Sequence, residues 1–439
     1  MNSVDSSKED GARYFLRCAG CGKTCAGKAY ELYCVDCGKN ALLVSQYQRA
    51  ADSSLPSDSF ERYAPYLPFE NTLGITGPTM ACVHAEGLGE SLGLERLWVA
   101  ISGYSRRWNS RFRSGTFKEC EALGVLNRVS EQTDKLLMIA SAGNAGRAFL
   151  ELGASSDIPV IVAMPASAAP LLSAQARNDR SPLLLLLEDA YYPDVIKFVE
   201  GALENFSTDL VREGGCFNVA RRDAMAVPFL RAVDAIGKLP DWYVQAVGSG
   251  TGAVAAMESI KRIASHRGEP AATRLLLVQN APFTPIVDAW QLRDRQLPRF
   301  EPDYVRDRVS SIRAQVLSNA SPPYAVKGGV FDILAESNGV ACAVDNDEIE
   351  AAQRLAEREL EFVPCDASSA ALAGLKKSIA RGDVSKDDLI LLHLTGGGFE
   401  ELAAVEGAHP YSNRVLANHS DTETFYGAIS AYIGRVRNK

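Results

Sequence analysis

The sequence predicts an α/β fold in which helices cover both faces of parallel sheets. One observation predicts this class, and a second indicates that the chain is an ordinary globular protein. Short apolar runs of strand length alternate with segments of helical periodicity along most of the chain. Of the 439 residues, 46% are hydrophobic and 23% are charged, as in ordinary globular proteins. Ligands of such folds bind beyond the carboxyl ends of the strands, so the loops that follow strands are the places to look for chemistry.

The predicted strands are short runs of apolar residues, which is typical of strands buried on both faces of a sheet. The five leucines at 183–187 fall far short of the roughly 18 apolar residues that a membrane-spanning helix needs, so they predict a buried strand. In chain order, strands are predicted at 97–101, 136–140, 159–163, 183–187, 242–247, 275–279 and 389–394.

Between these strands, apolar residues recur every three or four positions, the spacing that places them on one face of a helix. Helices are therefore predicted at 118–131, 145–152, 194–205, 223–236, 252–265, 347–359 and 368–380. The segment 50–68 is rich in Ser, Pro, Asp and Tyr and has no clear period. It is predicted to be a linker.

The charge balance excludes several function classes. Lys and Arg total 46 against 54 Asp and Glu, a net charge of -8, which gives no global reason to approach nucleic acid or an anionic membrane. The first residues include Asp5, Glu9 and Asp10 and no apolar run, which argues against a secretory signal. With too few cysteines for a disulfide scaffold, the simplest expectation is a reducing cytoplasm.

Four cysteines near the beginning have the spacing of a zinc ribbon. Cys18 and Cys21 form one C-x-x-C pair and Cys34 and Cys37 a second, each followed by Gly. Two such pairs turn four thiolates toward one point, the tetrahedral shell that Zn²⁺ prefers, and the metal would supply most of the folding energy of so short a segment. A redox pair and a ribbon without metal are the alternatives.

The loop after the strand at 136–140 combines small residues with an asparagine at the start of a helix. Ser141, Ala142 and Gly143 let backbone N–H groups and the helix N-terminus face a carboxylate or phosphate. Asn144 adds a side-chain amide for a phenolate or carbonyl oxygen. A plain tight turn would explain the small residues equally well.

Two further loops are rich in glycine. The first lies before an Ala-rich helix and predicts a phosphate cradle that needs no lysine; it consists of Gly248, Ser249, Gly250, Thr251 and Gly252. It matches neither the P-loop pattern nor the dinucleotide pattern. The second closes the last strand, where Thr395 precedes three glycines that would allow a flat ring to lie close to the backbone.

Lys118 stands at the start of the predicted helix 118–131, in the sequence Ser-Gly-Thr-Phe-Lys-Glu-Cys. Most lysines lie on the surface, and that is the ordinary alternative here. The positive end of the helix dipole would lower the pKa of Lys118. A lysine with a lowered pKa is what a Schiff base requires.

Taken together, these motifs resemble one enzyme class. The order of Thr-Phe-Lys-Glu, the asparagine loop, the Gly248–Gly252 cradle and the final Thr395 is similar to that of fold-type II pyridoxal-phosphate enzymes. The cysteine pairs and the segment 73–79, Leu-Gly-Ile-Thr-Gly-Pro-Thr, resemble the threonine synthase branch. Within that branch the Gly-Thr-Phe-Lys-Glu and Thr-Gly-Gly-Gly sequences are most similar to the cysteate synthase family; threonine synthases carry Ser-Phe-Lys-Asp instead.

The resemblance implies roles for the site residues. Lys118 would form the internal aldimine, Asn144 would bond the phenolate oxygen of the cofactor, and Thr395 would face the pyridine nitrogen, while the 248–252 loop would hold the cofactor phosphate. The substrate would contact Thr116, Ser141, Ala142 and Gly143.

The implied reaction is a β-replacement in which O-phospho-L-serine and sulfite give L-cysteate and phosphate through an aminoacrylate, with Lys118 moving the proton. Three alternatives stay open: a threonine synthase acting on O-phosphohomoserine and water, a β-replacement with another nucleophile, and a non-catalytic zinc-ribbon protein that senses a metabolite. The expected partners are small molecules, with no nucleic acid and no membrane.

Anionic substrates require local positive charge in an acidic chain. Arg106, Arg107, Arg111 and Arg113 lie just before Lys118 and are predicted to bind the substrate anions, with Lys327 as a further candidate. A solvated basic loop is the alternative.

The resemblance also implies the domain organisation. A zinc-ribbon-like segment spans 12–45, a large cofactor-binding domain spans 46–134 and 226–439, and a small mobile α/β domain spans 135–225. A homodimer is the expected assembly.

Overall fold

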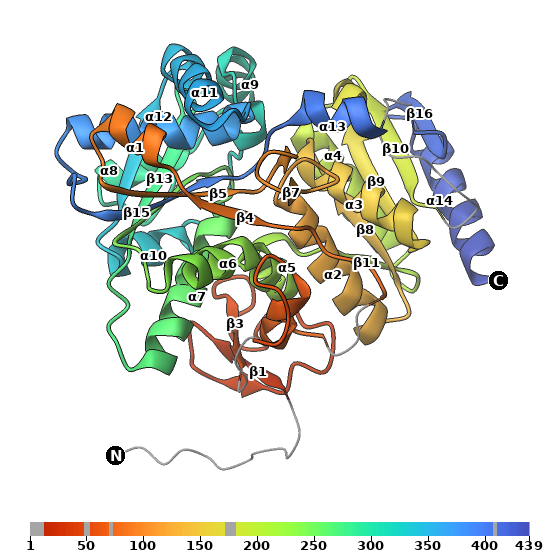
Figure 1. Cartoon of the computed structure of the whole chain (residues 1–439). Helices are drawn as coiled ribbons and strands as arrows, with labels where there is room; N and C mark the ends of the chain where they lie inside the picture. The colour runs from red at the N-terminus through yellow and green to blue at the C-terminus, as the bar shows by residue number, and fades with distance from the viewer. Residues whose placement is uncertain (1–12, 48–52, 70–72, 172–180, 407–410, 439) are drawn as a thin grey trace.

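The computed structural model describes residues 13–47, 53–69, 73–171, 181–406 and 411–438. Two sheets form the centres of two lobes, and a third, small sheet lies below them (Figure 1). The larger sheet has the strand order β14-β13-β12-β15-β5-β4, and the smaller has the order β11-β8-β9-β10-β16. All pairs in these two sheets are parallel except β4 with β5.

The large sheet is covered by helices on both faces. Its strands alternate their side chains between two hydrophobic clusters: Leu276 and Val278 of β13 point to one cluster, and Leu275 and Leu277 to the other. This double burial explains why the strands read as unbroken apolar runs. The strands are β4 (Ala81–His84), β5 (Arg96–Ile101), β12 (Trp242–Ala246), β13 (Arg274–Asn280), β14 (Val340–Val344) and β15 (Leu389–Leu394).

Helix α12 of this lobe packs directly on the central strands β12, β13 and β15. A methyl group at Gly374 of α12 would collide with the side chain of Val278, so the helix lies close against the sheet. The helices are α1 (Glu86–Leu92), α6 (Val227–Ile236), α7 (Thr251–Arg267), α8 (Pro285–Gln291), α9 (Pro302–Ser311), α10 (Val330–Glu336), α11 (Asn346–Leu360), α12 (Asp366–Ala380) and α13 (Phe399–Glu406).

The small sheet follows the same principle. The predicted strand of five leucines forms β10, and its residues alternate between the two faces: Leu184 and Leu186 join one cluster, and Leu183, Leu185 and Leu187 the other. The elements are β8 (Leu136–Ala140), β9 (Val160–Pro165), β10 (Leu183–Glu188), β11 (Leu210–Arg212) and β16 (Arg414–Asn418), with helices α2 (Lys118–Gln132), α3 (Asn144–Ser156), α4 (Tyr192–Asn205), α5 (Val219–Met225) and α14 (Thr422–Arg437).

The end of the chain returns to the small sheet, which differs from the predicted division of the chain. We expected 226–439 to lie wholly in the large domain, but β16 pairs in parallel with β10, and Phe425 and Ile429 of α14 pack in the same cluster as β10. Residues 414–418 carry little signal in the sequence, because an edge strand with exposed alternate residues lacks the apolar run of a central strand.

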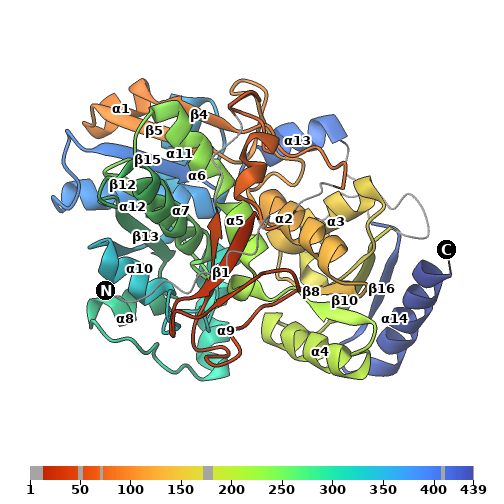
Figure 2. The ribbon, with the colours of Figure 1, turned by 90° about the horizontal axis from the view of Figure 1, so that it is seen from below.

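The cysteine-rich segment forms the third sheet, from the antiparallel strands β2 (Thr24–Cys25), β1 (Tyr14–Cys18) and β3 (Leu43–Tyr47). Seen from below, it lies beneath the junction of the two lobes (Figure 2). The hydroxyls of Ser45 and Tyr47 donate hydrogen bonds of 2.6 and 2.7 Å to Asp223 of α5. These buried bonds fix the segment to the body of the molecule.

All seven predicted strands and the helical segments are confirmed, with shifts of a few residues at their ends. The predicted helix 223–236 is two helices, α5 and α6, because Pro228 lies in the first turn of α6 and cannot continue a helix from before it. The predicted linker is not loose where it is described: Phe60 and Tyr63 are buried in the core, beside the short 3-10 helix Glu61–Tyr66. No helix among the described residues has the length and apolarity needed to cross a membrane.

Candidate active site

A cavity of about 770 Å³ collects residues from both lobes and from the cysteine-rich segment. It lies at the carboxyl ends of β8, β12 and β15, where ligands of parallel sheets bind. Twelve of the residues singled out in the sequence line it: Thr116, Lys118, Ser141, Ala142, Gly143, Asn144, Gly248, Ser249, Gly250, Thr251, Gly252 and Thr395. Segments far apart in the chain therefore face one space.

Lys118 is held at the cavity by the end of β15. The N–H of Phe117 donates to the carbonyl oxygen of Thr395 at 2.9 Å, and Thr116 forms a bridge with Gly396. The Phe117 ring packs edge-on against His393, which is buried and neutral because burial lowers its pKa to about 3. These contacts fix the backbone on which Lys118 begins helix α2.

The amine of Lys118 lies beside a carboxylate that was not among the predicted site residues. Lys118 Nζ donates to Glu121 Oε2 at 2.8 Å, and the Glu121 side chain is fully buried. Burial lowers the pKa of Lys118, while the charge of Glu121 acts in the opposite direction. Residues three apart on a helix lie on one face, so the Lys-x-x-Glu spacing was the available signal.

Arg221 of α5 joins the same cluster. One of its terminal nitrogens lies 3.0 Å from Glu121 and 2.7 Å from Glu213, which follows β11, and all three side chains are at most 12% exposed. Two carboxylates thus surround one guanidinium and one amine. The cluster is neutral only while Lys118 carries a proton, so it favours return of a proton to that amine.

The glycine loop between β12 and α7 has the form of an anion cradle. Gly250 has φ of +75°, and a methyl group there would collide with Val330, so the turn requires glycine. Among the described residues, no acceptor takes the amide hydrogens of Gly248, Ser249 or Gly250. Unpaired amides at the start of a helix are suited to a phosphate.

The loop after β8 is ordered by its own serine. The Ser141 hydroxyl accepts hydrogen bonds from the N–H groups of Gly143 at 3.2 Å and Gly146 at 2.7 Å. A methyl group at Gly146 would lie 2.6 Å from the sulfur of Met164, so α3 starts in close contact with β9. The turn holds Asn144, half-buried, at the wall of the cavity.

The three glycines after Thr395 were expected to make room for a flat ring, but the structure gives them another role. A methyl group at Gly396 would lie 2.9 Å from the carbonyl oxygen of Gly115, and one at Gly397 would lie 2.5 Å from that of Val363. Within the described residues 395–398, Thr395 alone lines the cavity. The glycines therefore accommodate neighbouring backbone rather than a flat ring.

Comparison with known proteins identifies the family. The family model "Pyridoxal-phosphate dependent enzyme" matches residues 77–396, which is most of the chain and includes every cavity residue outside the cysteine-rich segment. The chain belongs to this family.

The curated relatives of this pyridoxal-phosphate (PLP) enzyme match it over almost their whole length. A cysteate synthase of Methanoregula boonei is 38% identical over 427 residues, covering 96% of this chain and 98% of that protein. A cysteate synthase of Methanospirillum hungatei is 36% identical over 387 residues, covering 88% and 90%.

Solved structures agree on the fold. A threonine deaminase from T.th. matches 74% of this chain and 92% of its own with a TM-score of 0.53 at 17% identity. Diaminopropionate ammonia lyase of Escherichia coli matches 82% and 96% with a TM-score of 0.57 at 12% identity. The predicted fold-type II architecture is thereby confirmed.

The residues of this PLP enzyme fit its cofactor. The unpaired amides of the 248–250 turn suit the phosphate, and the buried amine of Lys118 opens onto the same cavity. Lys118 is the one lysine besides Lys39 among the described cavity residues; its side chain is 19% exposed, whereas Lys39 is exposed.

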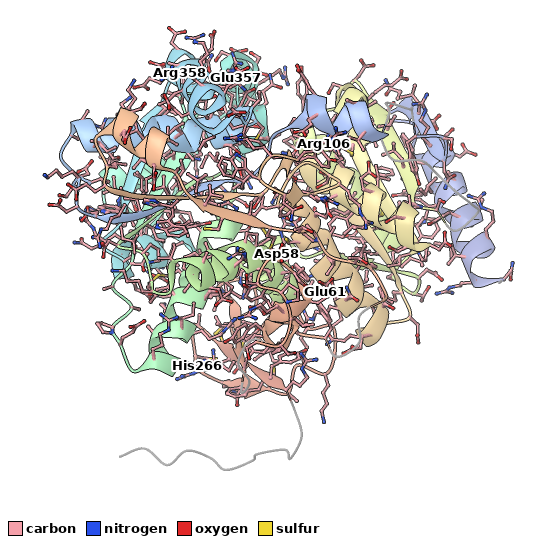
Figure 3. The ribbon with its side chains drawn as sticks, viewed as in Figure 1. Asp58, Glu61, Arg106, His266, Glu357 and Arg358 are labelled. Atoms are coloured by element: carbon pink, nitrogen blue, oxygen red, sulfur yellow. The ribbon has the colours of Figure 1, made fainter. Side chains whose placement is uncertain are left out.

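The arginines predicted to bind substrate lie elsewhere. Arg106 lies at the surface beside α13 (Figure 3) and contacts Glu401. Arg107 lies 3.1 Å from Glu361. Arg111 is exposed and Arg113 half-buried, and neither lines the described cavity; the same holds for Lys327. The short hairpin of β6 (Tyr104–Ser105) and β7 (Ser110–Arg111) turns this basic stretch outward, which matches the alternative of a solvated loop.

Glu119, next to Lys118, leads to a prediction about pH. It is 1% exposed, and burial raises the pKa of its carboxyl to about 7. The usual value in an unfolded chain is about 4.3, so the folded state holds a proton that the unfolded state loses as the pH rises from about 4 to about 7. Stability should therefore fall across that window and stay level above it.

Glu119→Gln should remove this slope and raise the free energy of unfolding by up to about 3 kcal/mol above pH 7, with no gain below pH 4. Melting temperatures across the pH range test it. Glu90→Gln, on an exposed position of α1, serves as the control. A Glu119→Gln protein that keeps the wild-type slope would contradict the assignment.

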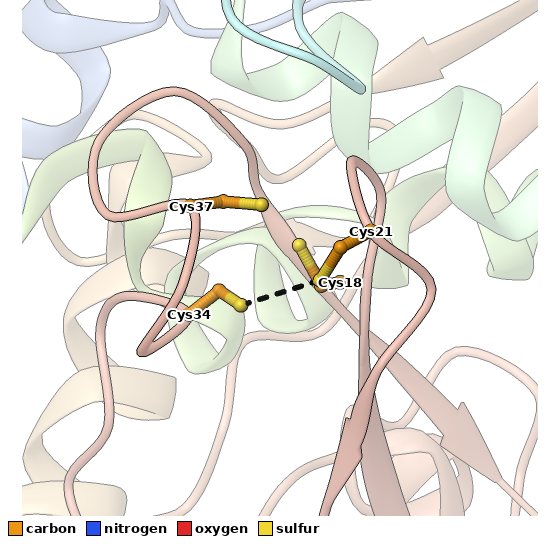
Figure 4. A group of neighbouring side chains, drawn as sticks. All are labelled: Cys18, Cys21, Cys34 and Cys37. Carbon is orange, nitrogen blue, oxygen red and sulfur yellow. Dashed lines mark hydrogen bonds between the residues drawn. The ribbon is translucent and has the colours of Figure 1, made fainter.

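The four cysteines of the predicted ribbon converge. The sulfur atoms of Cys18, Cys21, Cys34 and Cys37 all lie within 4.8 Å of one another (Figure 4). Sulfurs bound to zinc at about 2.3 Å in a tetrahedron lie about 3.8 Å apart. Cys21 and Cys34 are 3.6 Å apart. Cys25 lies outside this group and bonds Glu31.

Proposed function

We propose that this PLP enzyme converts O-phospho-L-serine and sulfite into L-cysteate and phosphate. The observation that carries the proposal is the similarity to cysteate synthases at 36 and 38% identity over at least 88% of this chain. The cavity supports it with a buried amine, an anion cradle and an asparagine loop on one surface. Membership in the family of pyridoxal-phosphate dependent enzymes argues against the alternative of a non-catalytic sensor.

We propose that the cofactor phosphate binds the amides of the 248–252 loop, with the hydroxyls of Ser249 and Thr251 beside it. Asn144 would bond the ring oxygen, and Thr395 would face the ring nitrogen. When bound, pyridoxal phosphate supplies the electron sink that allows a Cα proton to leave. A hydroxyl beside the ring nitrogen keeps that sink weak, which favours elimination of a β-leaving group.

Lys118 would hold the cofactor and then act as the base at Nζ. Its burial favours the neutral amine that must accept the Cα proton, and Glu121 stabilises the ammonium that results. The 141–143 loop would bind the substrate carboxylate through the amide of Ala142, because the N–H groups of Ser141 and Gly143 already donate within the protein. Thr116 also lines the cavity. The chain thus provides separate groups for proton transfer and for orientation.

The test is a substrate panel with the purified holoenzyme. O-phosphoserine with sulfite should release phosphate and give a product of the mass of cysteate, and release should depend on sulfite. Turnover of O-phosphohomoserine alone would favour threonine synthase instead. A different adduct mass from a panel of other nucleophiles would assign another β-replacement.

We also propose that Cys18, Cys21, Cys34 and Cys37 bind a structural zinc ion. The convergence of the four sulfurs supports this. A strong chelator should expose four additional thiols to a thiol reagent and loosen the segment around them, because so small a sheet has little core of its own. The control Cys25→Ser, at a cysteine outside the group, should leave the metal content unchanged. Equal numbers of reactive thiols with and without the chelator would contradict the site.

We propose a cytoplasmic homodimer with a small domain that moves during turnover. All ten cysteines are free thiols, which suits a reducing compartment. Sedimentation velocity tests the assembly. Hydrogen exchange of 135–225 with and without O-phosphoserine tests the motion.

A further inference from the structure

The positive charges at the cavity are not those that the sequence suggested. The cations among its described lining residues are Lys39, Lys118, Arg212 and Arg221. Lys118 and Arg221 are matched by two carboxylates, Glu121 and Glu213. Lys39 and Arg212 form no ion pair with any residue in the described ranges. The acids among the described lining residues are Glu213 and the exposed Glu200, so the cavity keeps an excess of positive charge even when Glu121 is counted with them.

Lys39 reaches the cavity from the cysteine-rich segment. Its Nζ lies 6.0 Å from the centre of the Tyr33 ring, and the centre of that ring lies 5.1 Å from that of Phe217. Tyr33 and Phe217 also line the cavity. Because Lys39 is two residues after Cys37, the cysteine pairs set the position of its backbone.

The wall that carries Arg212 is fixed to the same segment. The Tyr30 hydroxyl lies 3.1 Å from the carbonyl oxygens of both Arg212 and Glu213. A methyl group at Gly214 would lie 2.6 Å from Leu32, so the two chain segments pack in close contact. The cysteine-rich segment therefore forms part of the cavity wall.

We propose that Lys39 and Arg212 bind an oxyanion in the exposed part of the cavity, either the phosphate of the amino-acid substrate or sulfite. Arginine offers paired donors to an oxyanion and lysine a point charge. Lys39 is exposed and Arg212 half-buried, which leaves both accessible from solvent. The inference rests on the proposed function, and it makes the cysteine-rich segment part of the substrate site.

The experiment measures anion binding to the holoenzyme by titration calorimetry, with inorganic phosphate and sulfate as unreactive probes. Lys39→Gln and Arg212→Gln should each weaken binding of at least one probe about tenfold or more, since each removes a charged hydrogen-bond donor. Arg212→Lys should recover part of the loss. Lys23→Gln, on the same segment in an ion pair with Asp36, and Arg354→Gln, exposed on α11, should bind as the wild type does.

Steady-state kinetics then separates the two anions. A raised KM for O-phosphoserine with kcat little changed assigns the pair to the phosphate; a raised KM for sulfite assigns it to the nucleophile. Melting temperatures of the variants should match the wild type, because neither side chain forms an ion pair within the described fold.

The inference is overturned if the wild type binds neither probe, or if both Gln variants bind as tightly as Lys23→Gln. Binding is measured without turnover, so its outcome is independent of the reaction. An enzyme that makes no cysteate but loses anion affinity in the two variants would overturn the proposed function alone.

Discussion

Replacement of Lys118 by alanine is expected to lower product formation by at least about 1000-fold, because one amine serves both to hold the cofactor and to move the Cα proton. The fold should persist, since Glu121 keeps Arg221 as its partner. Phosphate release from O-phosphoserine measures the rate, and circular dichroism checks the fold. Borohydride treatment followed by peptide mass analysis should place the cofactor on residue 118 of the wild type only.

Lys261→Ala is the matched control, because Lys261 lies on the surface of α7 in an ion pair with Glu336. It should keep wild-type activity and cofactor content. A Lys118→Ala protein with more than about a tenth of the wild-type rate would overturn the role of this amine.

Replacement of Arg221 by methionine is expected to cost about 3 to 5 kcal/mol of unfolding free energy, because it leaves Glu213 buried without its cation and Glu121 with Lys118 alone. Burial raises the pKa of Glu213, with the charge of Glu121 acting in the same direction. The loss should shrink as the pH is lowered, since protonation of the carboxyl removes the buried charge. Denaturant unfolding at several pH values measures it.

Two variants make this test specific. Arg221→Met combined with Glu213→Gln should recover a large part of the lost stability. Glutamine at position 213 carries no charge, so no buried carboxylate is left there without its cation. Arg354→Ala, in an exposed pair with Glu350, should change stability by less than about 1 kcal/mol. Equal unfolding midpoints for Arg221→Met and the wild type at neutral pH would exclude a cluster of coupled charges.

Local motifs predict only part of the active site. The asparagine loop and the glycine cradle each depend on a few adjacent residues, and turn chemistry acts over that range. Glu121 was within reach of the same reasoning, through its spacing from Lys118. Arg221 and Glu213 were not, because only the packing of α5 and the end of β11 beside α2 brings them to the lysine.

The basic stretch before Lys118 lies close to it in sequence but not in the folded site. Its four arginines are close to Lys118 in sequence, yet the hairpin β6–β7 directs Arg106 and Arg107 to surface carboxylates on α13 and at the end of α11. Proximity along the chain does not set the direction of a side chain in an irregular loop. The cavity takes its unmatched charges instead from Lys39 and Arg212.

Periodicity and short-range spacing were enough to predict the alternation of strands and helices, the family resemblance, the four converging cysteines and the lysine with its two glycine-bearing loops. Three features emerged only from the folded chain: β16 and α14 return to the small sheet, Arg221 and Glu213 join the cluster of Lys118 and Glu121, and the cysteine-rich segment forms a wall of the cavity. These features depend on contacts between elements distant in the chain, which are fixed by how helices and sheets pack rather than by any local pattern.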